Sequence, residues 1–418
     1  MGRQNGLDYE ENSRNLRAYM KILIITPFYY IEGRPDLQHD TNAIHYFAKY
    51  WSYDNEVKVL NVYPHSYKDL KRYFKIENRD FYKKGYVFIK DNIEICIAEI
   101  QKLPGQKGEY NYVQCRHIID IFQKWNEKSP FIPDVILVHV PSYAYSFIDS
   151  IKDFYANKIP CIGILHKTDI EEMERNIRVK NILEDKYYEL FARSHGIKKK
   201  ASVIGLSNLK QEIIQSGIPL QQSEGKYAPH SIERQLRVIY VGKLIQLKHV
   251  DKIIEAMGIL NNQKIYLEIV GEGPEEEKLK NLVNEKKLYE QVEFVGKLPR
   301  EEVFSHMANA NLFCMPSYPE TLGLTYLEAM SVGCVPIGTM GEGIDGIIID
   351  GQNGYLVDPN DLVDDLVNKI NTYYSLTDLD RKQMSINAKE SVRQLDEPRC
   401  ARYYLELIKR SVVNAGKE

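Results

Sequence analysis

Two glutamates, Glu320 and Glu328, flank the expected start of one helix in the C-terminal half of the chain. Gly323 lies between them, and the helical pattern begins near Leu324. A helix N-terminus presents free N–H groups and a partial positive charge, which suit an anion. Glu328, in the second turn, would lean back toward that end. The pattern therefore predicts a ligand that carries both an anion and hydrogen-bond donors.

A nucleotide sugar has both features. Its phosphates can accept from the N–H groups, and a carboxylate can accept two hydrogen bonds from the ribose diol. The second carboxylate would then lie near the transferred sugar. A surface helix with glutamates at ordinary positions is the alternative that the spacing leaves open.

Two lysines follow the first apolar run of this half, at Lys243 and Lys248. Two cations and a helix N-terminus can balance a diphosphate without a metal ion. Two solvated lysines on a loop are the alternative. The D-x-D pattern at 378–380 favours helix capping over metal binding. We therefore expect no metal site and no cofactor beyond the nucleotide sugar as a substrate.

Composition narrows the class of protein. A chain of 418 residues is too long for one ordinary core and suits two domains. The net charge of −3 does not favour nucleic acid as a partner. The six cysteines form no C-x-x-C pair, which is typical of reduced, cytosolic residues. No apolar run reaches the ~20 residues that span a bilayer.

Short apolar runs alternate with helical patterns throughout, as in parallel α/β layers. In the first half the predicted strands are 21–26, 56–62, 93–100, 134–140, 160–165 and 201–207, with helices at 41–51 and 207–217. In the second half the predicted strands are 236–242, 264–271, 291–296, 311–315 and 334–338. Ligands of such sheets bind at the carboxyl ends of the strands, so two facing sheets would form a cleft.

The organisation predicted from these patterns has five segments. They are an extension or expression remnant at 1–19, an acceptor-side Rossmann-like domain at 20–222, a linker at 223–236, a donor-side Rossmann-like domain at 237–395 and a crossing helix at 396–418. The segment from Tyr67 to Tyr86 mixes basic and aromatic residues. It suits peripheral contact with an anionic membrane surface, or a solvated helix with aromatic anchors.

The segment from Pro316 to Pro359 resembles the retaining glycosyltransferases of family four, which have the GT-B fold. The similar features are two glutamates separated by seven residues, the "EAM" that follows, and "DGQNGYLVDP" further on. The resemblance implies that Glu328 holds the ribose and that Glu320 lies beside the donor sugar. It further implies that the backbone from Thr321 to Leu324 meets the diphosphate and the sugar.

The resemblance also marks residues elsewhere. The basic pair of the family matches Lys243 and Lys248. The family usually has a pair of glycines after the first strand, which contacts the donor. This chain has only Gly33 there, and the resemblance implies that it contacts the donor. His166 matches a histidine at a strand end near the donor sugar and acceptor, and Ser207 matches a serine at a helix N-cap. Leu322 stands where the family usually has an aromatic residue.

These features predict a retaining hexosyltransferase that moves a sugar from a nucleotide diphosphate donor to an acceptor hydroxyl. The predicted catalytic residues are His166, Glu320, Lys243 and Lys248. The expected acceptor is a glycan or a lipid-linked glycan, in the assembly of surface polysaccharide or glycolipid, and the expected location is the cytoplasm or the inner face of the membrane. A nucleotide-sugar epimerase and a non-catalytic partner subunit are the alternatives.

Overall fold

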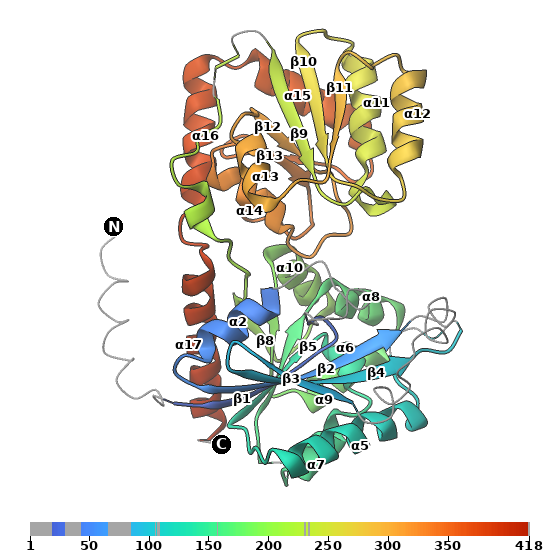
Figure 1. Cartoon of the computed structure of the whole chain (residues 1–418), viewed down its shortest axis with the longest axis vertical. Helices are drawn as coiled ribbons and strands as arrows, with labels where there is room; N and C mark the ends of the chain where they lie inside the picture. The colour runs from blue at the N-terminus through green and yellow to red at the C-terminus, as the bar shows by residue number, and fades with distance from the viewer. Residues whose placement is uncertain are drawn as a thin grey trace. The chain divides into compact units, whose positions relative to one another are not determined.

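The structure is a computed structural model that describes residues 19–29, 43–65, 85–104, 106, 109–156, 158–229, 231–232 and 235–416. The chain forms two compact units (Figure 1). The first comprises Met1–Ala192, Lys200–Ile214 and Cys400–Glu418, and the second comprises Arg193–Lys199 and Gln215–Arg399.

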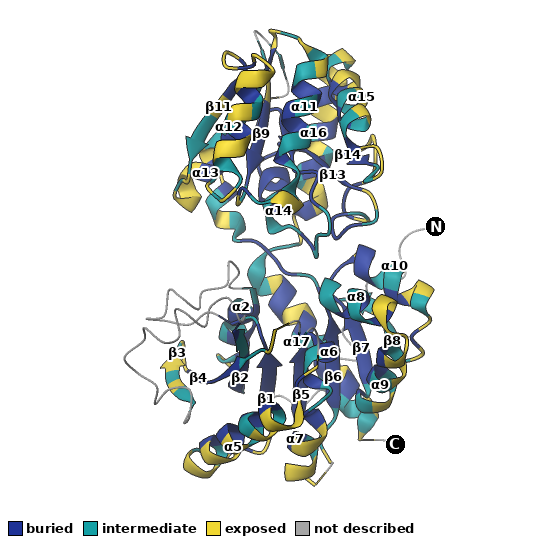
Figure 2. Ribbon diagram, turned by 90° about the vertical axis from the view of Figure 1, so that its right-hand side faces the viewer, coloured by how far each residue is buried: buried dark blue, intermediate teal, exposed yellow. Residues whose placement is uncertain are grey.

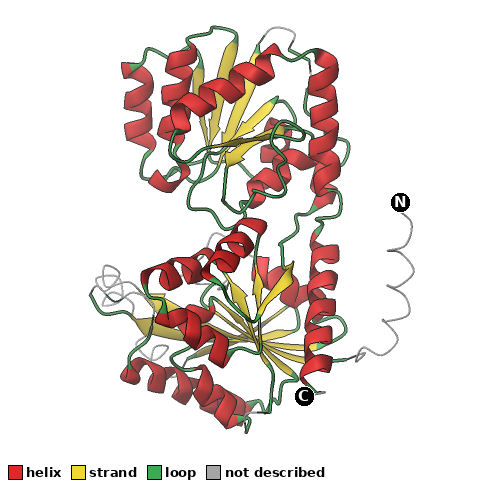
Figure 3. Cartoon of the chain, turned by 180° about the vertical axis from the view of Figure 1, so that it is seen from behind, coloured by secondary structure: helices red, strands yellow, loops and turns green. Residues whose placement is uncertain are grey.

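The first unit is built on an eight-stranded sheet in the order β3-β4-β2-β1-β5-β6-β7-β8. Its strands are β1 (Lys21–Thr26), β2 (Glu56–His65), β3 (Tyr86–Lys90), β4 (Ile93–Gln101), β5 (Val135–His139), β6 (Cys161–Leu165), β7 (Glu189–Ala192) and β8 (Leu209–Ile213). Only β3 pairs antiparallel, with β4, among the strands described here. The central strands β5 and β6 are buried throughout, because helices cover both faces of a parallel sheet (Figures 2 and 3).

The helices of this unit connect and cover the strands. They are α2 (Ala43–Trp51), α5 (Tyr112–Lys128), α6 (Pro141–Ala144), α7 (Ile148–Phe154), α8 (Lys167–Arg175), α9 (Arg178–Lys186), the second half of α10 (His195–Ile204) and most of α17 (Glu397–Ala415). The last helix docks here through aromatic contacts. The Trp51 indole N–H donates to the Ala401 carbonyl at 2.7 Å, and Tyr404 packs edge-on against Trp51.

The second unit contains a six-stranded, all-parallel sheet in the order β11-β10-β9-β12-β13-β14. The strands are β9 (Leu236–Val241), β10 (Ile265–Val270), β11 (Val292–Gly296), β12 (Leu312–Cys314), β13 (Val335–Thr339) and β14 (Tyr355–Val357). Around them lie the 3₁₀ turns η4 (Leu220–Ser223) and η5 (Gln246–Lys248) and the helices α11 (Val250–Leu260), α12 (Glu276–Glu285), α13 (Arg300–Met307), α14 (Leu324–Ser331), α15 (Leu362–Ser375) and α16 (Asp378–Val392).

The prediction of a strand over 201–207 and a helix over 207–217 is wrong. Residues 195–204 form α10, in which Ile197 and Ala201 are buried one helical turn apart. The N-cap is Ser194, whose hydroxyl accepts from the Ile197 N–H at 3.3 Å. Gly205 ends the helix with φ +81°, so Ser207 follows a helix and precedes β8 instead of capping. The apolar run at 201–206 suggested a strand, but the buried residues of this segment recur at the spacing of a helix, and the helix forms.

The Asp378–Asp380 pattern lies in the first turn of α16, where Thr377 is the N-cap. The Thr377 hydroxyl accepts from the Asp380 N–H at 3.2 Å, and Asp378 pairs with Arg381. Both carboxylates are therefore used at a helix start, as the sequence predicted.

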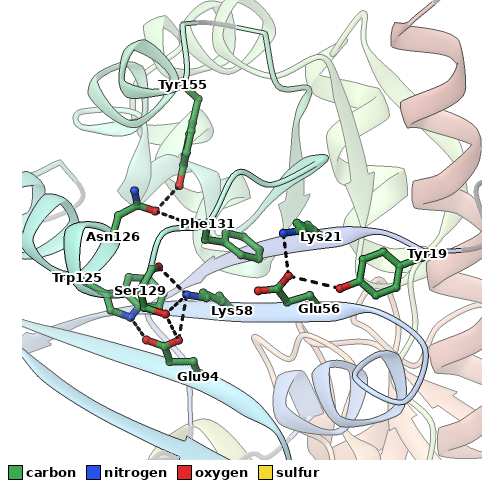
Figure 4. Close-up of polar contacts among 10 residues, drawn as sticks. All are labelled: Tyr19, Lys21, Glu56, Lys58, Glu94, Trp125, Asn126, Ser129, Phe131 and Tyr155. Carbon is green, nitrogen blue, oxygen red and sulfur yellow. Dashed lines mark hydrogen bonds and ion pairs between the residues drawn. The ribbon is translucent and has the colours of Figure 1, made fainter.

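An ion pair between the buried Lys58 and the partly buried Glu94 ties β2 to β4 and to the end of α5 (Figure 4). Lys58 Nζ lies 3.0 Å from Glu94 Oε2 and also donates to the Ser129 carbonyl at 2.8 Å. The Trp125 indole N–H donates to the other oxygen of Glu94 at 2.6 Å. Burial opposes ionisation of Glu94, but the hydrogen bonds from Lys58, Ser129 and Trp125 outweigh it and lower its pKa.

We expect the substitution Lys58→Met to lower the free energy of unfolding of this unit by about 2 kcal/mol, because Glu94 is left as a partly buried charge without its cation. Both tryptophans of the chain, Trp51 and Trp125, belong to this unit, so urea unfolding followed by tryptophan fluorescence reports on it. The double variant Lys58→Met, Glu94→Gln should recover part of the loss. The control is Lys278→Met in an exposed ion pair, which should change stability by less than ~0.5 kcal/mol. If Lys278→Met lowered the free energy of unfolding as much as Lys58→Met does, the interpretation would be contradicted.

Candidate active site

The order of strands in the second unit creates a natural binding position. The chain moves from β9 to β10 on one side and later returns to β12 on the other side of β9. The loops that follow β9 and β12 therefore diverge at the carboxyl edge of the sheet, which leaves a crevice where ligands of such sheets bind. The loop after β9 carries Lys243 and Lys248, and the loop after β12 carries Glu320. The predicted residues thus lie on the two loops at the strand-order reversal.

Lys248 and Glu320 form an ion pair across these loops. Lys248 Nζ lies 2.5 Å from Glu320 Oε2, and the Ser317 hydroxyl donates to the same oxygen at 3.2 Å. The backbone N–H of Thr321 donates to Oε1 at 3.0 Å. Both side chains retain partial exposure, about a fifth for the lysine and less for the glutamate. Each carboxylate oxygen therefore has a partner, and the pair remains accessible to a ligand.

Gly323 sets the direction of helix α14. Its φ of +74° places it in the left-handed region, and it immediately precedes the first helical residue, Leu324. A Cβ here would lie 2.6 Å from the ring of Tyr326, whose hydroxyl donates to the Met315 carbonyl at the end of β12. A side chain is therefore disfavoured both by the backbone and by the space. The glycine lets the helix begin directly beneath the loop that carries Glu320.

The loop 341–346 forms hydrogen bonds with the backbone of Glu320. The Glu320 backbone N–H donates to Glu342 Oε2 at 2.5 Å, and the Gly343 N–H donates to the Glu320 carbonyl at 3.1 Å. A Cβ at Gly343 would lie 2.0 Å from the Thr321 carbonyl oxygen, so only glycine allows this approach. Leu322 is buried in the core beneath the loop. These contacts hold the segment from Glu320 to Gly323 in one conformation.

Glu328 pairs with Arg300, a residue that the sequence analysis did not single out. Arg300 begins α13, and its Nε and Nη2 both donate to Glu328 Oε1, at 3.1 and 2.5 Å. Burial raises the pKa of Glu328, and the charge and hydrogen bonds of Arg300 act in the opposite direction. The local sequence carried no signal for this pair, because Glu301 and Glu302 already supply carboxylates in the first turn of α13 and Glu328 is 28 residues away.

Lys243 lies two residues after the end of β9, and its carbonyl accepts from the Tyr240 hydroxyl at 3.0 Å. The buried tyrosine thus anchors the backbone from which this lysine extends. The structure brings Lys248 and Glu320 into contact, places Thr321 to Leu324 beside them, and pairs Glu328 with Arg300 instead of with either lysine.

His166 lies in the first unit, where it follows β6 and precedes α8. Its backbone N–H donates to Asp169 Oδ2 at 2.6 Å, and its ring nitrogen Nε2 lies 3.1 Å from Nδ1 of His139. Asp169 is fully buried, and burial raises its pKa to about 7 despite the backbone N–H donors around it. The predicted histidine therefore stands at the carboxyl edge of its own sheet.

Two of the predicted features lie outside the described residues: Gly33, and the basic, aromatic segment 67–86 apart from its last two residues. In the part of the chain that the structure describes, no helix is long and apolar enough to cross a membrane. Within the same residues, no group of three or more histidine, cysteine, aspartate or glutamate side chains is arranged to hold a metal ion.

Comparison with protein families gives one match, to the model described as "Glycosyl transferases group 1", over residues 224–391. Residues 224–391 belong to the group 1 glycosyl transferases. The match includes both glutamates, both lysines and Arg300. A relative, the amylovoran biosynthesis glycosyltransferase AmsK of Erwinia amylovora, is 26% identical over 252 residues, which are 56% of this chain and 60% of that protein. The chain thus matches less than two thirds of that relative's length.

Solved structures extend the similarity in fold to nearly the whole chain. The sucrose-phosphate synthase of Thermosynechococcus elongatus matches with a TM-score of 0.69 and 18% identity, over 94% of this chain and 98% of the other. The HepE protein of Anabaena, in complex with UDP, matches with a TM-score of 0.67 and 18% identity, over 94% and 100%. These matches and the two mostly parallel sheets confirm the predicted GT-B fold class.

The pairing of Arg300 with Glu328 leads to a pH-dependent prediction. A carboxyl group whose pKa is raised in the folded state stabilises the fold when it is protonated, and this contribution is lost as the pH rises through the raised pKa. Without Arg300 the pKa of Glu328 should rise further. We therefore expect Arg300→Ala to lower the free energy of unfolding by about 1–3 kcal/mol at pH 8 and by clearly less at pH 5.

The measurement is urea unfolding at both pH values, followed by far-UV circular dichroism. Arg300→Lys retains the charge and should show a smaller loss at pH 8. A loss that is the same at pH 5 and pH 8 would mean that Arg300 acts through packing alone.

Proposed function

We propose that the chain is a retaining glycosyltransferase that moves a sugar from a nucleoside diphosphate sugar to an acceptor hydroxyl. The observation that carries the proposal is the Lys248–Glu320 pair at the strand-order reversal of the second sheet, beside the glycine-initiated helix α14. The family match and the relatives support the reaction class. The HepE complex with UDP supports a uridine diphosphate sugar as the first donor to test.

The negative charge of the diphosphate determines the roles of the residues around it. The diphosphate carries negative charge that increases on the leaving oxygen as the sugar departs. Lys243, Lys248 and the N–H groups at the start of α14 are the groups that can stabilise it. In the proposed complex Lys248 leaves Glu320 for the phosphates. Glu320, still held through its backbone by Glu342, can then accept from a hydroxyl of the sugar.

Glu328 is proposed to accept from the ribose diol, with Arg300 keeping its buried carboxylate ionised. His166 of the first unit is proposed to contact the reacting sugar or the acceptor hydroxyl. We do not assign Glu320 as a nucleophile, because a front-face displacement needs only that the leaving diphosphate be stabilised.

The test begins with donor binding and ends with transfer. UDP-, GDP- and ADP-glucose are compared by thermal shift, where a donor at ~100 times its Kd stabilises the protein by about 2.7 kcal/mol. With the donor so found, Lys248→Ala should lower kcat by about 10²–10³-fold, as does the loss of one group that stabilises a developing oxyanion. The control is Lys252→Ala on α11, which pairs with Glu255 on its own helix and should leave kcat unchanged.

Normal turnover by a folded Lys248→Ala, Lys243→Ala variant would overturn the assignment of the diphosphate site. Incubation with the donor alone separates transfer from epimerisation, because an epimerase would change the sugar without an acceptor. No stabilisation by any nucleotide sugar would overturn the function itself.

A lipid-linked or glycan acceptor at the membrane surface is a further part of the proposal. The segment from Tyr67 to Tyr86 carries seven basic residues: Lys68, Lys71, Arg72, Lys75, Arg79, Lys83 and Lys84. Each basic residue near an anionic surface contributes about 1 kcal/mol, and salt screens this attraction. We expect weak co-sedimentation with anionic liposomes that rises with anionic lipid content and is lost at high salt.

Replacement of Lys68, Lys71 and Lys75 by alanine should weaken co-sedimentation by at least tenfold. Alanine at Lys278, Lys280 and Lys286 of the second unit removes the same charge elsewhere and should have little effect. Equal loss in both triple variants would indicate a general charge effect, and no binding at low salt would favour a soluble acceptor.

A further inference from the structure

The geometry points to His139 as a positioning residue that fixes the imidazole of His166, with Tyr404 of the C-terminal helix fixing His139 in turn. The inference rests on the proposed function for its consequence, since His166 is the residue assigned to the reacting groups. The contacts themselves lie within the first unit.

Neighbouring parallel strands bring the two histidines together. His139 is the last residue of β5 and pairs with Ile164 of β6, and His166 immediately follows the end of β6. The two rings meet edge to face, with centroids 5.4 Å apart and planes at 66°. Nδ1 of His139 lies 3.1 Å from Nε2 of His166. At this distance the two imidazoles form a hydrogen bond.

The second nitrogen of His139 meets the C-terminal helix. Its Nε2 lies 3.4 Å from the hydroxyl of Tyr404, and both side chains are almost completely buried. Tyr404 cannot easily move, because its ring packs edge-on against Phe47 at 5.1 Å and against Trp51 at 4.8 Å. The helix that supplies it comes from the far end of the sequence.

The backbone on both sides of the pair is held by one carboxylate. Asp169 accepts from the His166 N–H through Oδ2 at 2.6 Å and from the Ser142 N–H, just after β5, through Oδ1 at 2.8 Å. Phe28 packs against the His166 ring at 5.8 Å between centroids. The strand ends that carry the two histidines are therefore tied to each other independently of the two imidazole rings.

The chemistry of the contact couples the two rings. In a hydrogen bond between two imidazole nitrogens, one must carry the proton and the other must accept. The tautomer of His139 therefore determines the tautomer of His166, and the Tyr404 hydroxyl biases that of His139. The shared contact holds a single proton, so it is lost if both rings become cationic. A chain of three groups thus sets which nitrogen of His166 can donate or accept toward a substrate.

The experiment compares three variants in the full-length protein. His139→Leu removes both nitrogens, His139→Asn keeps a hydrogen-bonding group near the position of Nδ1, and Tyr404→Phe removes only the hydroxyl. His65→Leu is the control, because it removes a buried imidazole that is bonded to Glu99 on strands away from His166. Melting temperatures and circular dichroism establish that each variant is folded.

The first readout does not need activity. Long-range ¹H–¹⁵N spectra of the histidine side chains report tautomers, and the His166→Gln variant identifies the His166 signals. We expect one tautomer of His166 in the wild type and in His65→Leu, and a mixture in His139→Leu, with partial recovery in His139→Asn and a smaller change in Tyr404→Phe. An unchanged tautomer of His166 in folded His139→Leu would overturn the inference.

The second readout is kinetic. His139→Leu should lower kcat on the order of 10- to 100-fold, as misplacement of a reacting group does, with the KM for the donor within about twofold of the wild-type value. His139→Asn should restore part of kcat. A changed tautomer with unchanged kcat would support the coupling of the rings and would instead overturn the proposed role of His166 in the reaction. A rise in KM with unchanged kcat would overturn the positioning role.

Discussion

All six strands of the second unit run in the same direction, and the candidate site depends on this constraint. Parallel strands end at one edge, so the loops that follow them gather there whatever their separation in the sequence. Lys248 and Glu320 are 72 residues apart and are joined by a contact of 2.5 Å. The reversal of strand order between β9 and β12 adds an opening at that point. An antiparallel arrangement of the same segments would send alternate loops to opposite edges.

The charged partners of the two glutamates then determine which ligand groups this edge of the sheet can bind. Glu328 is buried, and its ionised form is costly unless a cation or several donors offset the lost hydration. Arg300 supplies that cation, and Lys248 balances Glu320 in a more exposed setting. The two carboxylates therefore differ in environment: one is buried and held by a guanidinium, and the other is partly exposed and paired with an ammonium. In the proposed function, this difference would give Glu328 a fixed ribose contact and Glu320 an exchangeable contact beside the diphosphate.

The first unit uses the same rule of strand ends for different chemistry. Its strands β5 and β6 bring His139 and His166 together, and α17 contributes Tyr404 from the end of the chain. The sheet thus determines the distance between the imidazoles, while the helix determines the surroundings of one of them. Aromatic packing of Tyr404 against Phe47 and Trp51 makes this contribution rigid. Stability of the docked helix and the orientation of His166 are therefore linked.

By itself, the sequence determined the α/β class, most of the strands, and the start of a helix at Leu324 directly after Gly323, because these follow from short-range period, helix-end chemistry and motif spacing. It misplaced the segment after residue 201, where an apolar run resembled a strand but the buried spacing of Ile197 and Ala201 belongs to a helix. Only the tertiary structure decided that Arg300 is the partner of Glu328 and that His139 and Tyr404 adjoin His166. These contacts join residues 27 to 265 positions apart. Their partners are chosen by strand order and helix docking, which no local pattern contains.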